Sequence, residues 1–400
     1  MRIGMMVDVY KSHVSGITNY IKLNKRHLEK AGHKVFVFTF GDEDHKNDDP
    51  TIIQSPGLPL VDTGYYLNIR YNQQARKMLR TMDVVHVHHP FLSGRLSLHY
   101  CKPRGIPILF TNHTRYDLYA HAYIPYLPDG VGETFLRAYL PAFCRSMNLV
   151  VAPSPGMRDV LKRVGVTSQI EVVPNGVDIT PFQKDVQPID RSEFGFGNDD
   201  VVLIYAGRLG PEKNLPFLLR AFNGVTQTYD NIRLLIVGDG PERENLEDRL
   251  RHMGIASQVR LTGIVNYEDI PRYLAMADAF VTASVTEVHP LSVIEAMASG
   301  LPVLGIQSPG VGDTIEDGET GLIVSEEDLA AFTAKLVRLV TDHDMRQQMS
   351  VQARHTSGIY AIERTTKIMM EHYQHLAYQS MGHKRSLRTR ILGIVDNWRK

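Results

Sequence analysis

Cysteine and tryptophan are almost absent from the 400-residue sequence, which contains two cysteines and one tryptophan. Cys101 and Cys144 stand far apart, so the chain has neither a disulfide framework nor a C-x-x-C metal site. We expect both thiols to be buried and reduced, as is usual for proteins of the cytoplasm.

A charge excess and a long apolar run are also missing. Lys+Arg and Asp+Glu both number 44, so the formal net charge is zero and the composition does not favour a nucleic-acid partner. No stretch approaches the ~18 apolar residues that span a bilayer. Asp8 and Lys11 interrupt the apolar start of the chain, which predicts a first strand rather than a signal peptide. We therefore expect a cytoplasmic protein, peripheral at most on the inner face of the plasma membrane.

The sequence does contain a repeated alternation of short apolar runs and longer amphipathic stretches. Such an order predicts a parallel sheet with helices on both faces. The pattern is interrupted by the Pro-, Gly- and Asp-rich segment 180–200 and then restarts, which predicts two doubly wound α/β domains joined by a linker. Because ligands bind at the carboxyl ends of such strands, we expect a site in a cleft between the domains. The expected strands are 3–9, 35–40, 84–87, 108–111 and 149–152, then 201–206, 232–237, 259–262, 279–283, 302–306 and 321–324.

Two common phosphate-binding patterns are incomplete. A dinucleotide fingerprint requires G-x-G-x-x-G between a strand and a helix, and the nearest match, which starts at Gly238, has Arg243 in place of the third glycine. There is no Walker A sequence. An NAD enzyme and a P-loop NTPase are therefore disfavoured, and Gly238 and Gly240 fit a tight strand-to-helix turn equally well.

Two basic residues follow the first strand of the second domain, in Y-A-G-R-L-G-P-E-K-N. Arg208 provides a planar guanidinium and Lys213 a mobile point charge, a pair suited to two bridged phosphates. The spacing places both at the carboxyl edge of the sheet, where a ligand would bind. The alternative interpretation is two solvated charges on a surface loop.

Two glutamates flank the start of a later helix, in T-E-V-H-P-L-S-V-I-E-A-M-A-S-G. The sequence predicts Pro290 at the first helical position, N1, with Glu287 on the loop before it. The free amides at the helix start can hold an anion. Glu295 lies within an apolar helix, so we expect it to be buried, to need a partner and to accept the hydroxyls of a ribose. The alternative is a surface carboxylate.

Taken together, these segments resemble the retaining glycosyltransferases of family 4. The E-x7-E motif at 287–295 is similar to the glutamate motif of the family, and the segment with Arg208 and Lys213 precedes it as it does there. P-N-G-V-D at 174–178 and V-G-D-G-P at 237–241 match two further family motifs. The resemblance spans most of the chain and implies the GT-B fold, with two Rossmann-like domains. It also implies a nucleotide-sugar donor as substrate, no cofactor and no metal.

The resemblance further implies how the chain is divided. Residues 1–184 would form an acceptor-side domain and 185–358 a donor domain. Residues 359–400 would form helices that cross back to the first domain and end in a basic amphipathic tail. We expect the enzyme to move a hexose, in the first place glucose from UDP-glucose, to an acceptor hydroxyl with retention at the anomeric carbon.

Family roles carry over to matching positions of this chain. Arg208 and Lys213 would hold the donor diphosphate, and Glu295 would bind the ribose. Glu287 would face the transferred sugar, and His113 would contact that sugar. The residues implied in catalysis are His113, Glu287, Arg208 and Lys213, and those implied in donor binding are Gly16, Arg208, Lys213, Gly238, His289, Leu291, Ser292 and Glu295.

The glutamate motif departs from the family pattern at one end. Many relatives read E-G-F-G or E-G-F-P, where this chain reads E-V-H-P from Glu287 to Pro290. Val288 in place of glycine narrows the room beside the sugar, and Pro290 offers no amide. The departure leaves the identity of the hexose open.

The segment after His113 is similar to the H-T-x-Y-x-x-Y segment of family members that glucosylate diacylglycerol. The resemblance implies that Tyr116, Tyr119 and His121 lie on the acceptor side, and such side chains suit an oily interface with a wet polar tip. The alternative is an aromatic loop that packs on its own domain.

The C-terminal segment 384–400 points towards a membrane. It has six Lys/Arg and one acidic residue, Asp396. A basic amphipathic helix predicts contact with an anionic membrane surface, and the alternative is a terminal helix docked on the first domain. The apolar residues at helical spacing are Leu387, Ile391, Ile394, Val395 and Trp398.

Other functions stay open at this stage. The acceptor could be a polysaccharide or a small soluble molecule, and an enzyme of the same fold could be a nucleotide-sugar epimerase. A catalytically inactive sugar-nucleotide sensor is disfavoured, because it would not need the complete set of basic and acidic residues. D-E-D at 42–44 fits the letters of a metal motif, but its acidic surroundings are typical of a solvated loop.

Overall fold

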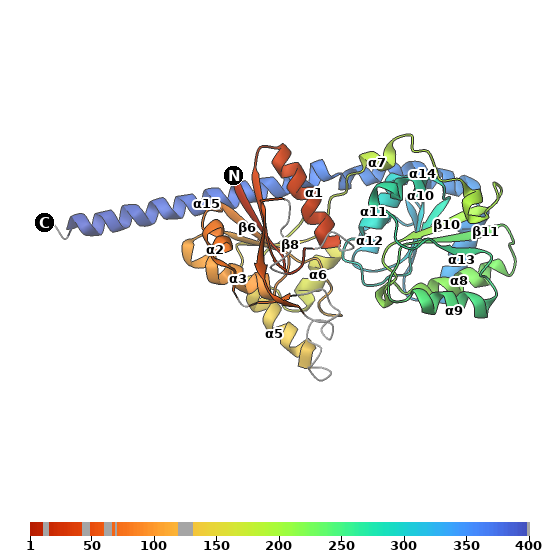
Figure 1. Ribbon diagram of the computed structural model, residues 1–400, viewed down its shortest axis with the longest axis horizontal. Coiled ribbons are helices and arrows are strands. Elements are labelled where there is room, and N and C mark those ends of the chain that lie inside the picture. The colour runs from red at the N-terminus through yellow and green to blue at the C-terminus, as the bar shows by residue number, and fades with distance from the viewer. Residues whose placement is uncertain (11–15, 42–48, 60–65, 69, 119–130, 398–400) are drawn as a thin grey trace. The chain divides into compact units, whose positions relative to one another are not determined.

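The computed structural model describes residues 1–10, 16–41, 49–59, 66–68, 70–118 and 131–397. Across these residues the chain forms two compact units (Figure 1). Unit 1 comprises Met1–Pro153, Arg158–Pro174 and Glu363–Lys400, and unit 2 comprises Ser154–Met157 and Asn175–Ile362.

The main part of unit 2 begins after Pro174, whereas the family resemblance implied a boundary at residue 184. The reason is that the P-N-G-V-D segment is already tied to unit 2. Val177 forms a backbone bridge with Ala361, and its amide donates to the carbonyl of Tyr360 at 3.0 Å.

The described part of unit 1 contains a seven-stranded sheet, in the order β3-β2-β1-β6-β7-β8-β9, whose neighbouring strands all run parallel. Parallel strands are buried on both faces, so most of them are continuous apolar runs. The strands are β1 (Arg2–Met6), β2 (Lys34–Gly41), β3 (Ile52–Pro56), β6 (Val84–Val87), β7 (Ile108–Thr111), β8 (Leu149–Ala152) and β9 (Ile170–Val172), with β4 (Leu58–Pro59) and β5 (Tyr66–Leu67) as a separate antiparallel pair.

Helices α1 and α15 share the same side of the unit-1 sheet (Figure 1, red and blue). Ile21 of α1 and Tyr373 of α15 belong to one buried cluster with Met5 of β1. The first part of the C-terminal helix is therefore part of the unit-1 core. The helices described with this unit are α1 (Gly16–Lys30), α2 (Gln73–Leu79), α3 (Leu92–Tyr100), η1 (Lys102–Arg104), α5 (Val131–Arg145), α6 (Pro155–Arg163) and α15 (Ile362–Asn397).

Unit 2 repeats the doubly wound design on its own. Its described residues form a six-stranded parallel sheet in the order β12-β11-β10-β13-β14-β15. Helices α8, α9 and α13 cover one face, and α7, α10, α11 and α12 pack on the other (Figure 1). The strands are β10 (Val201–Ala206), β11 (Ile232–Val237), β12 (Val259–Leu261), β13 (Ala279–Val281), β14 (Val303–Ile306) and β15 (Gly321–Val324).

The helices of unit 2 lie before, between and after these strands in the chain. They are α7 (Thr180–Gln183), η2 (Arg191–Phe194), η3 (Pro211–Lys213), α8 (Leu215–Thr226), α9 (Arg243–Met253), η4 (Tyr267–Asp269), α10 (Ile270–Ala275), α11 (Leu291–Ala298), α12 (Val311–Thr314), α13 (Leu329–Thr341), α14 (His343–Ser357) and η5 (Gly358–Tyr360).

The segment 180–200, expected to be a linker, is a packed part of unit 2. It includes α7 and η2, and Arg191 fixes it to the sheet. The Arg191 guanidinium donates to the carbonyl of Met276 at 2.9 Å and pairs with the Asp278 carboxylate at 3.0 Å. A Pro-, Gly- and Asp-rich composition therefore marks irregular backbone here, while the side chains still anchor it.

Candidate functional site

Two loops at the carboxyl ends of β10 and β11 are tied together by backbone hydrogen bonds. The amide of Leu209 donates to the carbonyl of Asp239, and the amide of Glu242 donates to the carbonyl of Leu209, both at 2.9 Å. Gly238 has φ +131°, and a Cβ atom there would lie 2.1 Å from the carbonyl oxygen of Gly207. The V-G-D-G-P motif thus forms a tight turn that lets the two loops touch. A donor contact at Gly238 stays a prediction.

An ion pair between Lys213 and Glu287 joins the two charged motifs of the sequence. The ammonium nitrogen of Lys213 lies 2.6 Å from Oε1 of Glu287, and about a fifth of each side chain is exposed. The backbone supports this approach, because the hydroxyls of Ser284 and Thr286 donate to the carbonyl of Glu212 at 3.1 and 3.3 Å. Unit 2 therefore brings a cation and a carboxylate together at the carboxyl edge of its sheet.

Arg208 lies on the same loop and is about half exposed. Its guanidinium is 3.8 Å from Oε1 of Glu212, which is a weak contact at that distance. The two basic residues that the sequence pairs are thus held differently: Lys213 is engaged by a carboxylate, and Arg208 stands at the surface where an anion can reach it.

Glu287 is followed by the N-terminus of α11. The carbonyl of Glu287 accepts from the amide of Gly310 at 3.0 Å, and a Cβ atom at Gly310 would lie 2.6 Å from the carbonyl carbon of Val288. Pro290 is the N-cap residue of α11 and not its N1 residue, because its ψ of 110° is extended. Leu291 opens the helix and Ser292 follows, so the predicted donor contacts at these two residues fall on its first turn.

Glu295 is buried within α11, as its apolar sequence predicts, with 7% of its surface exposed. Its partner is Tyr267 of η4, whose hydroxyl donates to Oε1 at 2.7 Å. Burial raises the pKa of the Glu295 carboxyl to about 7, and the hydrogen bond from Tyr267 acts against that shift. The sequence motifs did not indicate Tyr267. The only signal in the sequence was that a buried carboxylate requires a hydrogen-bond donor as its partner.

His289, which precedes the N-cap residue of α11, is buried in unit 2. Its ring is buried edge-on against Tyr360, with 5.1 Å between the ring centroids, and burial lowers the pKa of the imidazole to about 3. The carbonyl of His289 accepts a long hydrogen bond of 3.5 Å from the Asn175 amide of the P-N-G-V-D segment. The ring thus takes the packing role of an aromatic residue, and its predicted donor contact stays a prediction.

A histidine cluster lies at the carboxyl ends of β6 and β7 in unit 1. Nδ1 of His88 and Nε2 of His113 are 3.1 Å apart, so one of the two rings donates to the other. The ring of Tyr20 covers His113, with 4.8 Å between centroids. Burial lowers the pKa of His113 to about 3 and that of His88 well below its usual value, so both rings are neutral. His88 was missed from the sequence, although it follows a buried strand as His113 does.

The same cluster is anchored from the C-terminal helix. His86 of β6 lies between the hydroxyl of Tyr373 at 2.6 Å and that of Thr111 at 2.7 Å. Each ring nitrogen of His86 therefore has a hydroxyl partner. Since Thr111 ends β7 just before His113, this chain of contacts fixes the strand end that carries the predicted catalytic histidine.

The remaining predicted residues of unit 1 have varied surroundings. Gly16 is exposed and opens α1, where a Cβ atom would meet nothing within 4 Å. Tyr116 is 1% exposed and lies edge-on to Phe91 at 5.3 Å, which favours the alternative of an aromatic residue packed on its own domain. Tyr119 and His121 lie outside the described residues, as do 42–44 of the acidic loop.

Both cysteines are free and buried, as expected. Burial raises the pKa of the Cys101 and Cys144 thiols to about 12, so they stay protonated. Within the described chain, no group of three or more His, Cys, Asp or Glu side chains is arranged to hold a metal ion. None of the helices described has both the length and the apolar content that crossing a membrane requires.

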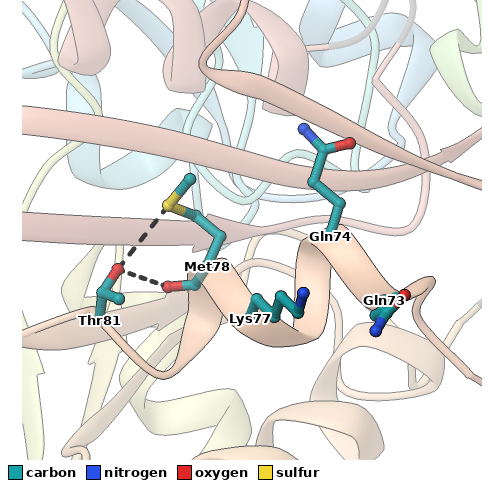
Figure 2. A pocket seen from close by; sticks show the side chains of 5 residues that line it. All are labelled: Gln73, Gln74, Lys77, Met78 and Thr81. Atoms are coloured by element: carbon teal, nitrogen blue, oxygen red, sulfur yellow. Dashed lines mark hydrogen bonds between the residues drawn. The ribbon is translucent and has the colours of Figure 1, made fainter.

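A surface hollow on unit 1 lies along α2 and offers little chemistry (Figure 2). It is lined by Gln73, Gln74, Lys77, Met78 and Thr81. The hydroxyl of Thr81 is already used, because it donates to the carbonyl of Met78 at 2.7 Å. Lys77 is the single charged residue of this lining, so the titratable groups of interest lie elsewhere.

Comparison with known proteins identifies relatives over most of the chain. The family model of the glycosyl transferases group 1 matches residues 186–356, and that of Glycosyltransferase Family 4 matches residues 14–180. Alpha-monoglucosyldiacylglycerol synthase of Streptococcus pneumoniae is 30% identical over 361 residues, which cover 87% of this chain and 80% of that protein. The protein of the same name in Acholeplasma laidlawii is 28% identical over 379 residues, covering 91% and 94%.

Solved structures show the same fold at lower sequence identity. The sucrose-phosphate synthase of Thermosynechococcus elongatus superposes with a TM-score of 0.75 at 21% identity, covering 94% of this chain and 98% of that one. The Anabaena HepE protein, solved in complex with UDP and glucose, gives 0.73 at 16% identity, covering 94% and 99%. These likenesses confirm the architecture of two doubly wound α/β domains predicted from the sequence.

Proposed function

The chain belongs to the family 4 glycosyltransferases and is a hexosyltransferase, and from this premise we propose that it moves glucose from UDP-glucose to a hydroxyl of diacylglycerol or another membrane lipid. The observation that carries the proposal is the 30% identity, over most of both chains, to a protein named alpha-monoglucosyldiacylglycerol synthase. The charged residues at the carboxyl edge of the unit-2 sheet support it, because their chemistry suits a nucleoside diphosphate sugar.

In the proposed reaction, an acceptor oxygen attacks the anomeric carbon while the bond from that carbon to the diphosphate breaks. The acceptor proton passes to the departing diphosphate oxygen. The sugar then carries oxocarbenium character, as it does in glycoside hydrolysis. With attack on the face from which the diphosphate leaves, the anomeric configuration is retained.

The described residues of unit 2 supply the charges for this reaction. Arg208 and Lys213 would bind the diphosphate, whose negative charge grows as the bond breaks. In the structure the Lys213 ammonium already lies against Glu287, so the lysine is fixed in place before a donor arrives. Glu287 would then face the transferred sugar and Glu295 the ribose. In unit 1, the neutral ring of His113 would contact the sugar.

A turnover assay with the full chain tests this function. Labelled UDP-glucose and diacylglycerol in mixed micelles should give an α-linked glucosyl lipid, identified by mass spectrometry and by digestion with α- and β-glucosidases. The rate should be unchanged in EDTA, because side-chain cations neutralise the diphosphate. GDP-mannose and UDP-N-acetylglucosamine serve as competing donors.

Other outcomes of this assay would contradict specific parts of the proposal. Transfer to a soluble sugar or a polysaccharide but not to lipid would show that the acceptor is wrong. Conversion of the donor sugar without any acceptor would indicate an epimerase. Complete loss of activity in EDTA, restored by manganese, would show that the diphosphate needs a metal.

For membrane contact, we propose that segment 384–400 binds anionic lipid. Each basic residue near such a surface contributes about 1 kcal/mol to the free energy of membrane binding. This attraction is electrostatic, and the Debye screening length falls to ~3 Å at 1 M salt. The chain should therefore sediment with anionic vesicles at low salt, bind neutral vesicles weakly and be released at high salt. Deletion of 384–400 should reduce this binding and leave UDP affinity unchanged.

A matched control removes the same kind of charge from the described part of α15. Arg364→Gln combined with Lys367→Gln changes two exposed basic residues of that helix. This variant should bind vesicles as the parent does. If deletion of 384–400 lowers the melting temperature but leaves vesicle binding intact, the tail is a docked structural helix.

A further inference from the structure

Glu295 has a neighbour to which no motif of the sequence points. Its carboxylate lies on α11, between apolar buried residues, and accepts a hydrogen bond of 2.7 Å from the hydroxyl of Tyr267. In the part of the chain that the structure describes, this is the one hydrogen bond made by the Glu295 carboxylate. The orientation of the carboxylate therefore depends on Tyr267.

Tyr267 is held in place from another part of unit 2. It opens η4, after strand β12 at the edge of the sheet, and its ring lies edge-on to Phe182 of α7 at 6.5 Å. Tyr267 is 45% exposed overall, yet its hydroxyl is directed at Glu295. A phenol donates a single hydrogen, so the bond to Oε1 leaves Oε2 available to a ligand.

We propose that Tyr267 is a positioning residue of the nucleoside site: its hydroxyl holds the Glu295 carboxylate in the orientation in which Oε2 receives a ribose hydroxyl. This inference rests on the proposed function, because it takes Glu295 as the ribose ligand. A carboxylate that becomes ordered only when the ligand binds loses conformational entropy, which lowers the affinity. A carboxylate that is already oriented avoids this loss. Tyr267 therefore acts through Glu295 before the nucleotide arrives.

The same hydrogen bond affects the charge of Glu295. Burial raises the pKa of the Glu295 carboxyl to about 7, and donation by Tyr267 opposes this because it favours the ionised form. Removing the hydroxyl should raise the pKa of Glu295 further, so that more molecules carry a neutral carboxyl at pH 7. A neutral carboxyl accepts hydrogen bonds from ribose hydroxyls more weakly than a carboxylate does.

Two charged side chains on helices that pack on α11 have hydrogen-bond partners other than the Glu295 carboxylate. Helix α7 and strand β14, which pack on α11, contain no titratable side chain. Asp313 of α12 accepts from a backbone amide, and Arg354 of α14 donates to a backbone carbonyl. Burial raises the pKa of the Tyr267 phenol, and the carboxylates of Glu295 and Asp178 raise it further, so the phenol stays protonated. Burial and Tyr267 thus govern the charge of Glu295.

The test is the pH dependence of UDP binding by the full chain, measured by calorimetry from pH 6 to pH 9. In the parent protein, affinity should rise as the pH increases through about 7. In Tyr267→Phe the midpoint of this pH dependence should move up by about one pH unit. The Kd for UDP at pH 7 should increase about tenfold. Tyr273→Phe is the matched control, because this tyrosine of α10 packs against Phe194, and it should bind as the parent does.

Two results would overturn the inference: an unchanged Kd in Tyr267→Phe, or a loss of affinity that is equal at every pH. Glu295→Gln, titrated in parallel, separates this failure from that of the proposed function. If Glu295→Gln loses affinity while Tyr267→Phe binds normally, only the role of Tyr267 is wrong. If Glu295→Gln binds UDP as tightly as the parent, the ribose assignment fails and the inference fails with it.

Discussion

Replacing Lys213 with alanine should lower kcat by about a hundredfold to a thousandfold, the loss typical when one group that stabilises developing charge is removed. The negative charge on the diphosphate grows as the glycosidic bond breaks, so an ammonium group beside it stabilises the transition state more than the bound donor. The KM for the nucleotide sugar should change much less than kcat. Steady-state kinetics with UDP-glucose measure both quantities.

Two further variants show whether the position and the charge of Lys213 matter. Lys213→Arg keeps the positive charge and should have a higher kcat than Lys213→Ala. Lys335→Ala removes another lysine of unit 2, one that pairs with Asp317 at 3.1 Å, and should leave kcat unchanged. A loss confined to KM in Lys213→Ala, or an equal loss in Lys335→Ala, would contradict the proposed role.

Strand positions were predictable wherever both faces of a strand are buried. Strands β6, β7, β8, β10, β11 and β15 have the bounds that their apolar runs predict. The two unpredicted strands of the unit-1 sheet, β3 and β9, are its edges. Gln54 interrupts the apolar run of β3, and all residues of β9 are half-buried, so neither gives the continuous signal of a buried strand. The first strand ends at Met6 rather than at residue 9.

The individual residues of the candidate site were predictable from their motifs, but the contacts between them were not. Lys213 and Glu287 are 74 residues apart, and each was placed at a strand end by its own motif. Their pairing at 2.6 Å depends on how the loops after β10 and β13 meet, which no local pattern encodes. Tyr267 was missed for the same reason: an exposed turn contributes one hydroxyl, and only the fold directs that hydroxyl to Glu295.

Replacing Glu295 with glutamine should weaken UDP binding at pH 8 tenfold or more. The substitution keeps the shape of the side chain but removes charge-assisted hydrogen bonds, each of which contributes about 1.5–3 kcal/mol. The same variant should be more stable than the parent at high pH. The pKa of Glu295 rises from 4.5 to about 7 on folding, so its protonated form stabilises unit 2 below pH 4.5, and this contribution is lost as the pH rises through about 7.

The size of the stability effect follows from the difference between these two pKa values. It corresponds to a change of about 3 kcal/mol in the free energy of unfolding between acidic and alkaline pH. Glutamine has no charge to bury, so Glu295→Gln should melt several degrees above the parent at pH 8 and close to it at pH 5. Glu244→Gln, at an exposed position of α9, should change neither melting temperature nor Kd. A gain in stability at pH 8 together with a loss of UDP affinity would show that the buried carboxylate is kept for its ligand at the expense of the fold. Equal melting shifts at both pH values would show that its charge is not the cause.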